Sequence, residues 1–371
     1  ITNVIGQTRI DGRITDKFTG DPLLGVNIFF SKTSLGTTTD KDGFYTFKYI
    51  PEGRYELVIS MIGYKMEKED LILFNKDRIA MDFRLTPEPI QMKEINVTWK
   101  SDKVWLENYD LFKKTFLGTS VNGEACRILN EYVLTFDRKR GLLVATASRP
   151  LQIENNRLGY GIVYYLDEFK LDDVYVRYAG DSFFTEMEPQ SEGQTKQWIK
   201  NRQIAYNGSL RHFLTTLGKR FELRYKMDGE NLVERDDWLS ISGRKGDPLI
   251  KEGFEVYLTK SHKSGITISD YRALLNDSLV SSAKNDSELL LSFNKKMKVY
   301  YKKESEEMNY ALDNFSEPKH QQTSYILLGK DLVIIDKNGR YFETYMIEQQ
   351  GYMGWERVGD QLPFDYVQPK D

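Results

Sequence analysis

The stretch that decides the fold is residues 19–64, TGDPLLGVNIFFSKTSLGTTTDKDGFYTFKYIPEGRYELVISMIGY. Apolar residues alternate with other residues in several short runs, and a period of two is typical of strands with one buried face. Asp42-Gly43 predicts a hairpin, because glycine tolerates the positive φ that such turns demand, and Pro51 with Gly53 predicts the next turn. Turn signals that recur roughly every 8–12 residues predict a small β-sandwich.

The run Asp40-x-Asp42-Gly43 has a second interpretation, since calcium-binding loops open in the same way. A complete loop of that kind needs further oxygen ligands and a glutamate at its twelfth position. The chain instead continues into Phe44-Tyr45-Thr46-Phe47, which is typical of a strand. We therefore interpret the run as a turn and predict no metal site.

Glycines, prolines and aspartates spread over residues 8–98 carry a family resemblance. They form the runs Gly12-x-Ile14-x-Asp16, Thr19-Gly20-x-Pro22-Leu23-x-Gly25-Val26, Gly36-Thr37-x-Thr39-Asp40-x-Asp42-Gly43-x-Tyr45, Pro51-x-Gly53-x-Tyr55 and Gly63-Tyr64. This pattern resembles the carboxypeptidase regulatory-like domain, a transthyretin-like sandwich that is widespread in envelope proteins of the Bacteroidetes. The family is related to the accessory domain of some carboxypeptidases and not to their catalytic domain. The resemblance therefore implies a scaffold or interaction module in an exported protein.

A domain boundary is predicted near residue 100. The run Thr86-Pro87-Glu88-Pro89 resists both helix and central strand, because proline lacks the backbone N–H that either would use. Ile90–Trp99 then predicts a closing strand of the sandwich. We expect a mainly β protein, with a sandwich over residues 1–99 and a larger, β-rich α+β domain over residues 100–371.

The second region begins with a change of pattern. Trp105–Phe116 predicts a short amphipathic helix. The longest helical pattern is Thr195–Leu217, which Asn207-Gly208-Ser209 interrupts, so we expect two helices with Ser209 capping the second.

Several further runs resemble the body that Bacteroidetes proteins join to a regulatory-like sandwich. They include Phe116-x-Gly118-Thr119, Leu158-Gly159-Tyr160, Ala205-Tyr206-x-Gly208-Ser209-x-x-His212-Phe213-Leu214 and Leu362-Pro363-Phe364-Asp365-Tyr366. This resemblance extends the two-part domain architecture to nearly the whole chain, but it implies no catalytic or binding function for the second part.

Residues that catalysis would need are scarce. None of the three histidines begins the His-x-x-Glu pair of a zinc carboxypeptidase. The single cysteine, Cys126, could be a nucleophile with His212 as its base, but we prefer a buried cysteine that packs as a small hydrophobe. A carboxylate pair such as Asp172-Asp173 is a further alternative, because glycosidases need only two carboxylates. We predict no catalytic residue, no cofactor and no metal.

One helical stretch carries a binding hypothesis, because basic and aromatic side chains are interleaved in it. The residues that we single out are Trp198, Arg202, Tyr206 and Arg211. Such a surface can bind nucleic acid, an acidic protein or lipopolysaccharide phosphates, whereas the ordinary alternative is the polar face of an amphipathic helix. The net charge of −3 favours no polyanion. We therefore predict no nucleic acid and favour a protein or glycan of the envelope.

The expected compartment is the periplasm or the outer-membrane surface. No apolar run reaches the length of about 18 residues that a membrane-spanning helix needs. Residues 1–6 suit either the tail of a leader peptide or an ordinary terminus. We predict a non-enzymatic envelope scaffold or interaction subunit with outer-membrane proteins as partners. The alternatives are a hydrolase with its site in the C-terminal domain and a carbohydrate-binding module, which exposed tyrosine and tryptophan on a sheet face would indicate.

Overall fold

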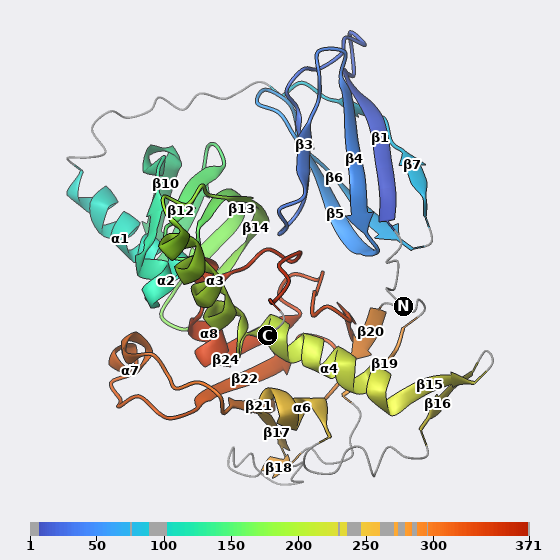
Figure 1. The fold of residues 1–371 in the computed structure, drawn as a ribbon. Helices are drawn as coiled ribbons and strands as arrows, with labels where there is room; N and C mark the ends of the chain where they lie inside the picture. Colours follow the sequence, from blue (N-terminus) through green and yellow to red (C-terminus); the bar gives the residue numbers. More distant parts are fainter. Residues whose placement is uncertain are drawn as a thin grey trace. The chain divides into compact units, whose positions relative to one another are not determined.

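The structure is a computed structural model, shown in Figure 1, and it describes residues 7–74, 76–88, 102–228, 231–235, 246–259, 271–273, 279–283, 288–294 and 296–369. The protein is mainly β, as predicted. The chain forms two compact units. Unit 1 comprises Ile1–Phe116, Ala125–Trp198 and Pro363–Val367, and unit 2 comprises Leu117–Glu124, Ile199–Leu362 and Gln368–Asp371. The predicted boundary near residue 100 and the predicted strand Ile90–Trp99 lie outside the described residues, as do residues 1–6.

The first part of unit 1 is the predicted sandwich. Its strands are β1 (Gln7–Asp16), β2 (Asn27–Phe30), β3 (Gly36–Thr38), β4 (Phe44–Pro51), β5 (Gly53–Ser60), β6 (Glu67–Leu73), β7 (Arg78–Ala80) and β8 (Phe83–Leu85). One sheet has the order β4-β1-β7, with β8 also pairing with β1, and the other has the order β3-β2-β5-β6. Apolar side chains from both sheets form the core between them, among them Ile10, Ile14, Ile28, Phe30 and Leu57.

The turn predicted at Asp42-Gly43 is present, but the pairing expected across it is wrong. The Asp40 carboxylate accepts hydrogen bonds from the backbone N–H groups of Asp42 and Phe44, both at 2.9 Å. Gly43 has φ +80°. However, β3 pairs with β2 and β4 pairs with β1, so the turn carries the chain from one sheet to the other. Turn geometry is local, whereas the pairing partner of a strand depends on distant parts of the chain.

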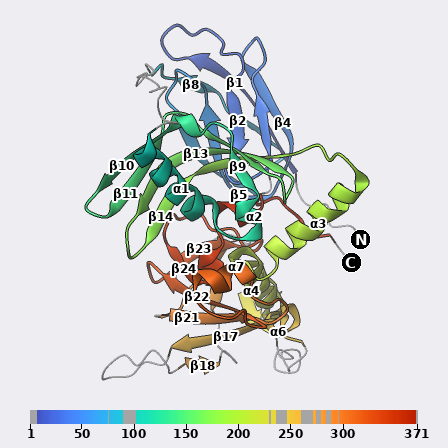
Figure 2. The same ribbon diagram turned by 90° about the vertical axis from the view of Figure 1, so that its left-hand side faces the viewer.

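The second part of unit 1 is a six-stranded sheet with the order β10-β11-β13-β12-β9, in which β14 pairs with β13. Its strands are β9 (Cys126–Ile128), β10 (Leu134–Lys139), β11 (Leu142–Ala147), β12 (Leu151–Asn155), β13 (Tyr160–Leu171) and β14 (Val176–Glu186), and the 3-10 turn η2 (Glu131–Val133) precedes β10. Helix α1 (Lys103–Leu117) lies across one face of this sheet (Figure 2). Phe112 packs edge-on against Phe169 and Phe116 against Tyr164, with ring centroids 4.7 and 5.0 Å apart. The predicted amphipathic helix is confirmed.

Hydrogen bonds inside unit 1 join the sandwich to β14. The backbone N–H of Lys32 donates to the carbonyl oxygen of Ser182 at 2.6 Å, and the N–H of Phe184 donates to that of Thr33 at 3.0 Å. The connection between β2 and β3 therefore pairs with the side of β14 that faces away from β13.

Charged side chains lie at the same junction. Asp181 is 2.5 Å from the Lys68 ammonium, and the Ser31 hydroxyl donates to it at 2.6 Å. Burial and a hydrogen bond with Asp181 raise the pKa of Glu56 to about 7. Burial alone would raise the pKa of Asp181, but the hydrogen bonds from Glu56, Lys68 and Ser31 lower it. We infer that Glu56 holds the proton and that Asp181 carries the charge.

Unit 2 combines sheets with short helices. A five-stranded sheet has the order β18-β17-β21-β22-β24, a three-stranded sheet has the order β19-β20-β23, and β15 pairs with β16. The strands are β15 (Tyr225–Asp228), β16 (Asn231–Glu234), β17 (Phe254–Thr259), β18 (Tyr271–Ala273), β19 (Val280–Ser282), β20 (Glu288–Leu291), β21 (Lys296–Tyr301), β22 (Gln322–Leu328), β23 (Val333–Asp336) and β24 (Ile347–Gly351). The helices are α2 (Val121–Glu124), α4 (Leu210–Arg224), α6 (Pro248–Glu252), α7 (Met308–Asp313), α8 (Tyr352–Trp355) and the 3-10 turn η3 (Val358–Asp360). Apolar residues of α4 share one core with β17, β21 and β22.

The helical pattern of Thr195–Leu217 divides into α3 (Glu192–Tyr206) and α4, as predicted. The Ser209 hydroxyl accepts a hydrogen bond from the His212 N–H at 3.2 Å, which confirms Ser209 as the N-cap of α4. Gly208 has φ +73°, and a Cβ at this position would lie 2.4 Å from Gln322 Oε1, so only glycine fits the break. No helix in the described ranges is long and apolar enough to cross a bilayer.

Candidate functional site

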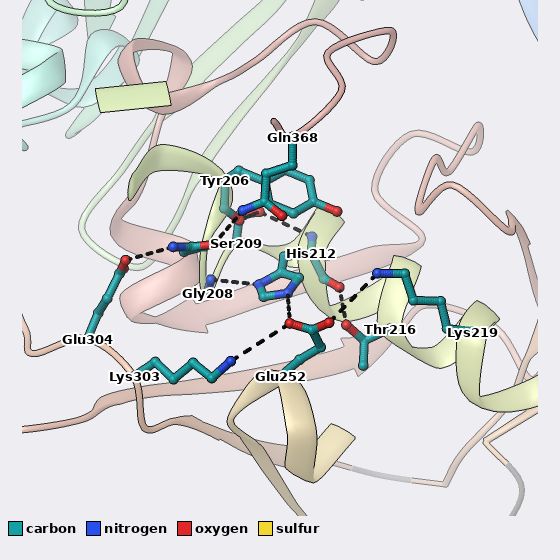
Figure 3. Close-up of polar contacts among 11 residues, drawn as sticks. Tyr206, Gly208, Ser209, His212, Thr216, Lys219, Glu252, Lys303, Glu304 and Gln368 are labelled. Atoms are coloured by element: carbon teal, nitrogen blue, oxygen red, sulfur yellow. Dashed lines mark hydrogen bonds and ion pairs between the residues drawn. The ribbon is translucent and has the colours of Figure 1, made fainter. Parts of the chain in front are cut away.

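Polar side chains gather around His212 in unit 2, and Figure 3 shows them as sticks. The break between α3 and α4 places His212 in the first turn of α4, because Ser209 begins that helix. Glu252 is the last residue of α6, and Lys303 and Glu304 follow β21. We use the name His212 cluster for the following six residues: Asn207, His212, Glu252, Lys303, Glu304 and Gln368.

His212 is buried, and both ring nitrogens have partners. Its Nδ1 accepts a hydrogen bond from the backbone N–H of Gly208 at 3.1 Å, so the ring proton belongs on Nε2. Nε2 lies 3.6 Å from Glu252 Oε2. Burial lowers the pKa of His212 to about 4, although the Glu252 carboxylate opposes the shift. The imidazole is therefore neutral at pH 7 and has no lone pair left to accept a proton from a substrate.

Glu252 also lies between two lysines. Its carboxylate is 3.8 Å from the Lys219 ammonium and 3.9 Å from the Lys303 ammonium. Both lysine side chains are about half exposed. Ion pairs of this length at the surface contribute little to stability, and the 3.6 Å contact with His212 Nε2 is the shortest of the three contacts of this carboxylate.

Glu304 ends a chain of side-chain hydrogen bonds. The Gln368 amide donates to Asn207 Oδ1 at 2.8 Å, and the Asn207 amide donates to Glu304 Oε1 at 3.0 Å. Burial raises the pKa of Glu304 to about 7, while hydrogen bonds from Asn207 and Gln322 oppose the shift. The cluster therefore satisfies its polar atoms internally, as buried networks in stable proteins do.

The chemistry available to the His212 cluster is limited. The described residues contain no group of three or more His, Cys, Asp and Glu side chains that could hold a metal ion. Cys126, the predicted alternative nucleophile, is buried in β9. The geometry fits a network that holds the start of α4 against α6 and the segment after β21.

The four predicted binding residues lie mostly inside the protein. Trp198 is buried in unit 1, where its Nε1 donates to the carbonyl oxygen of Asn156 at 2.9 Å. Arg202 and Tyr206 are buried in unit 2. The Arg211 guanidinium lies 5.7 Å from the Tyr206 ring centroid. These side chains do not form the exposed face that the hypothesis required, because their aromatic members pack into the core.

Sequence reasoning singled out Tyr206 and His212 but missed Glu252, Lys303, Glu304 and Gln368. The helix break at Asn207-Gly208-Ser209 was the available signal, since it is the point around which the cluster forms. The other members come from distant parts of the chain and share no motif spacing.

Comparisons with known proteins identify the first domain. Residues 10–97 match the model of the CarboxypepD_reg-like domain, which confirms the family resemblance of the sandwich. TonB-dependent receptor P39 of Formosa agariphila is 33% identical to this chain over 97 residues. Those residues are 26% of this chain and 9% of the receptor, so the match spans a small part of that protein.

Solved structures resemble parts of the chain. A 5-hydroxyisourate hydrolase of Klebsiella pneumoniae is 23% identical and covers 22% of this chain and 92% of its own, with a TM-score of 0.20. A pilus 2b backbone protein of group B streptococcus is 19% identical and covers 21% of this chain and 40% of its own, with a TM-score of 0.18. Scores this low support no argument about function.

Proposed function

We propose that this chain is a non-enzymatic interaction subunit of the cell envelope, located in the periplasm or at the outer-membrane surface. It binds a partner protein through one end of its CarboxypepD_reg-like sandwich. The proposal depends on large apolar side chains exposed at that end: Phe18 (75% exposed), Ile62 (70%), Leu24 (62%) and Phe44 (53%). We call them the apolar end. Adjacent exposed apolar groups of this size are typical of binding surfaces.

The strand register supports the grouping of the apolar end. Phe44 at the start of β4 pairs with Arg13 near the end of β1. Asn27 at the start of β2 pairs with Ser60 at the end of β5. The connections that follow β1 and β5 and those that precede β2 and β4 therefore lie at the same end of the sandwich.

Hydrogen bonds hold these connections in one arrangement. The Tyr64 hydroxyl donates to Asp16 Oδ2 at 3.0 Å, which ties the connection after β5 to the one after β1. The backbone N–H of Gly25 donates to the carbonyl oxygen of Thr39 at 3.1 Å. A surface that is already ordered loses little conformational entropy when it binds.

The charged groups near the apolar end favour a protein partner. Lys17, Lys65, Asp21 and Asp42 are all exposed in its connections. A rim with both signs of charge suits the mixed rim of a protein interface better than an anionic lipid surface, which attracts basic clusters. The relationship of the sandwich to a TonB-dependent receptor supports an envelope partner, and we propose an outer-membrane protein.

The non-enzymatic part of the proposal is supported by the His212 cluster. A general base must accept a proton, and the Nδ1 lone pair of His212 already accepts one hydrogen bond from Gly208. Burial also keeps the ring neutral, because it lowers the pKa to about 4.

Photo-crosslinking in native membranes tests the proposal. A photoreactive residue replaces Phe18 in the full chain, and the same residue at position 49 is the matched control, since Tyr49 is 69% exposed near the other end of β4. We expect position 18 to crosslink to one outer-membrane protein. A Phe18→Ser and Ile62→Ser double variant should reduce co-purification of that protein by about tenfold, because buried anchors dominate interface energies. Equal labelling from both positions, labelling of lipid alone, or a chain that purifies without a partner would contradict the proposal.

A further inference from the structure

We propose that Asn338 is a site of spontaneous deamidation and that its conversion loosens the turn after β23 from α4. The sequence contains three Asn-Gly pairs, at residues 122–123, 207–208 and 338–339. Asparagine followed by glycine is open to this reaction, because glycine has no side chain that would hinder attack by its own nitrogen. The structure distinguishes the three pairs by what holds each asparagine side chain. The proposal is independent of the apolar end and of any partner protein.

The reaction requires water and no other reactant. The backbone nitrogen of the glycine attacks the side-chain carbon Cγ of the asparagine, so a new C–N bond forms while the Cγ–Nδ2 bond breaks and ammonia leaves. The product is a cyclic imide. Water then opens the imide at one of its two carbonyl groups, which gives aspartate or isoaspartate. Both products carry a new negative charge, and in isoaspartate the main chain runs through Cβ and Cγ and is longer by one methylene.

The attacking nitrogen is in a similar state at all three pairs. Each glycine N–H donates one hydrogen bond, and the acceptors lie at similar distances: Ser120 Oγ for Gly123 at 2.9 Å, His212 Nδ1 for Gly208 at 3.1 Å and the Asp336 carbonyl oxygen for Gly339 at 3.0 Å. One such bond must break before any of these nitrogens can attack. The nitrogens therefore do not distinguish the pairs.

Hydrogen bonds hold the side chains of the first two asparagines. Asn122 is buried, and its Nδ2 donates to Asp360 Oδ1 at 3.0 Å. Asn207 is half-buried, and its amide donates to Glu304 Oε1 at 3.0 Å and accepts from the Gln368 amide at 2.8 Å. Rotating either side chain toward the glycine nitrogen would break these bonds and leave their partners unsatisfied, which is costly inside a protein.

The side chain of Asn338 is held differently. It is exposed, and within the described ranges no hydrogen bond holds its amide. Its backbone N–H, by contrast, donates to Asp336 Oδ1 at 2.9 Å. The side chain can therefore change rotamer without losing a hydrogen bond to the protein, and water can reach the imide once it forms. These two properties single out Asn338 among the three asparagines.

The position of this turn gives the modification a consequence. Gly339 packs so closely on α4 that a Cβ at this position would lie 2.3 Å from the Arg211 carbonyl oxygen and 2.6 Å from Thr215 Oγ1. The longer main chain of isoaspartate therefore has no room in the turn unless Gly339 moves away from α4. The new carboxylate would also lie two positions after Asp336, which is buried, and like charges at this separation repel.

Peptide mass spectrometry of the full chain tests where the reaction occurs. The folded protein is incubated at pH 8, and deamidation at each pair is followed as a mass increase of about 1 Da, because NH is replaced by O. We expect Asn338 to react at least about tenfold faster than Asn122 and Asn207, since the side-chain hydrogen bonds of those two must break first. In urea, where the chain is unfolded, the three rates should become similar.

Ageing the protein tests the consequence for the fold. Asn338→Gln is the matched variant, because glutamine keeps an amide at an exposed position but would have to form a larger ring. The parent and this variant are aged together, and denaturant unfolding is measured at intervals. We expect the denaturant midpoint of the parent to fall as position 338 is converted, while that of Asn338→Gln stays constant. Asn338→Asp supplies the charge without the longer main chain, so its midpoint should lie between those of the fresh and the converted parent.

Two outcomes would overturn the proposal. In the first, Asn122 or Asn207 reacts as fast as Asn338 in the folded chain. In the second, position 338 is converted but the aged parent keeps the denaturant midpoint of the aged glutamine variant. Neither outcome bears on the photo-crosslinking result, because that experiment probes position 18 in unit 1.

Discussion

The two units each contain a group of buried ionisable side chains, and the two groups are built differently. At the junction in unit 1, Asp181 carries a charge that Lys68 and Ser31 compensate. In the His212 cluster of unit 2, the buried imidazole ring is neutral, and its Nδ1 accepts a hydrogen bond from the backbone N–H of Gly208. Removing a partner from the first group leaves a buried charge, whereas removing a partner from the second leaves a buried dipole. The difference in cost between these two situations can be measured.

The largest expected effect is that of Asp181→Ala. This substitution removes a buried carboxylate and leaves the Ser31 hydroxyl and the protonated Glu56 carboxyl without their acceptor, so we expect a loss of about 3 kcal/mol of unfolding free energy. Asp167→Ala is the matched control, because Asp167 contacts the same ammonium at 3.0 Å but is 46% exposed. The control should cost below about 1 kcal/mol. Denaturant unfolding of both variants measures the difference, and equal losses would show that the buried carboxylate of Asp181 stabilises the fold no more than the exposed one of Asp167.

The next effect is that of His212→Ala, for which we expect a loss of about 2 kcal/mol, because a buried ring is removed and the Gly208 N–H loses its acceptor. His212→Asn should recover part of this loss, since its amide oxygen can accept the same hydrogen bond. Lys219→Ala is the control, because Lys219 contacts Glu252 of this cluster at 3.8 Å but is 54% exposed, and it should cost below about 0.5 kcal/mol. If the lysine variant is as unstable as the alanine variant of His212, the cluster depends on its charges and the contrast between the units fails.

The smallest effect is a dependence on pH. The pKa of Glu56 is about 7 in the folded protein and 4.5 as its ordinary value, so the folded state binds the extra proton between these values. This contribution to stability is complete below about pH 4.5 and is lost as the pH rises through about 7. Glu56→Gln should therefore reduce the fall in unfolding free energy between pH 5 and pH 8 by about 1 kcal/mol, a figure lowered for partial exposure.

Glu69→Gln is the control for the pH experiment, because Glu69 is an exposed glutamate on β6. Denaturant midpoints at both pH values give the comparison. The pKa of His212 is lowered to about 4, because burial in the folded state favours the neutral ring. His212 therefore makes the unfolding free energy fall as the pH drops below 6.5, which is opposite to the effect of Glu56. His212 is present in both proteins, so the difference between the parent and Glu56→Gln in the pH dependence of unfolding free energy reports the contribution of the Glu56 carboxyl group alone. If the unfolding free energy of Glu56→Gln falls between pH 5 and pH 8 by as much as that of the parent, Glu56 does not hold the proton at this junction.

Local features of the fold were predictable. The Asp40 carboxylate that holds the turn before β4 and the Ser209 hydroxyl that begins α4 act within four residues of their own positions. Such signals are present in the sequence because the interacting groups are neighbours in the chain. The family resemblance of residues 8–98 consists largely of turn residues of this kind, and it was confirmed.

Long-range features were not predictable. β3 and β4 belong to different sheets although a turn joins them, and the sandwich shares unit 1 with a sheet that begins at Cys126. The His212 cluster draws Glu252 and Glu304 from other elements. These arrangements depend on which faces are buried together, and a single sequence does not record that information.

The connection between β2 and β3 covers part of the free edge of β14, because its backbone forms hydrogen bonds with that strand. β14 is the outermost strand of its sheet, and an uncovered outermost strand invites pairing with another chain. Lys32 and Thr33 occupy the backbone groups of Ser182 and Phe184 in the middle of that strand. The regulatory-like domain thus also shields its neighbour from self-association, and a chain from which this domain has been deleted would be prone to aggregate through β14.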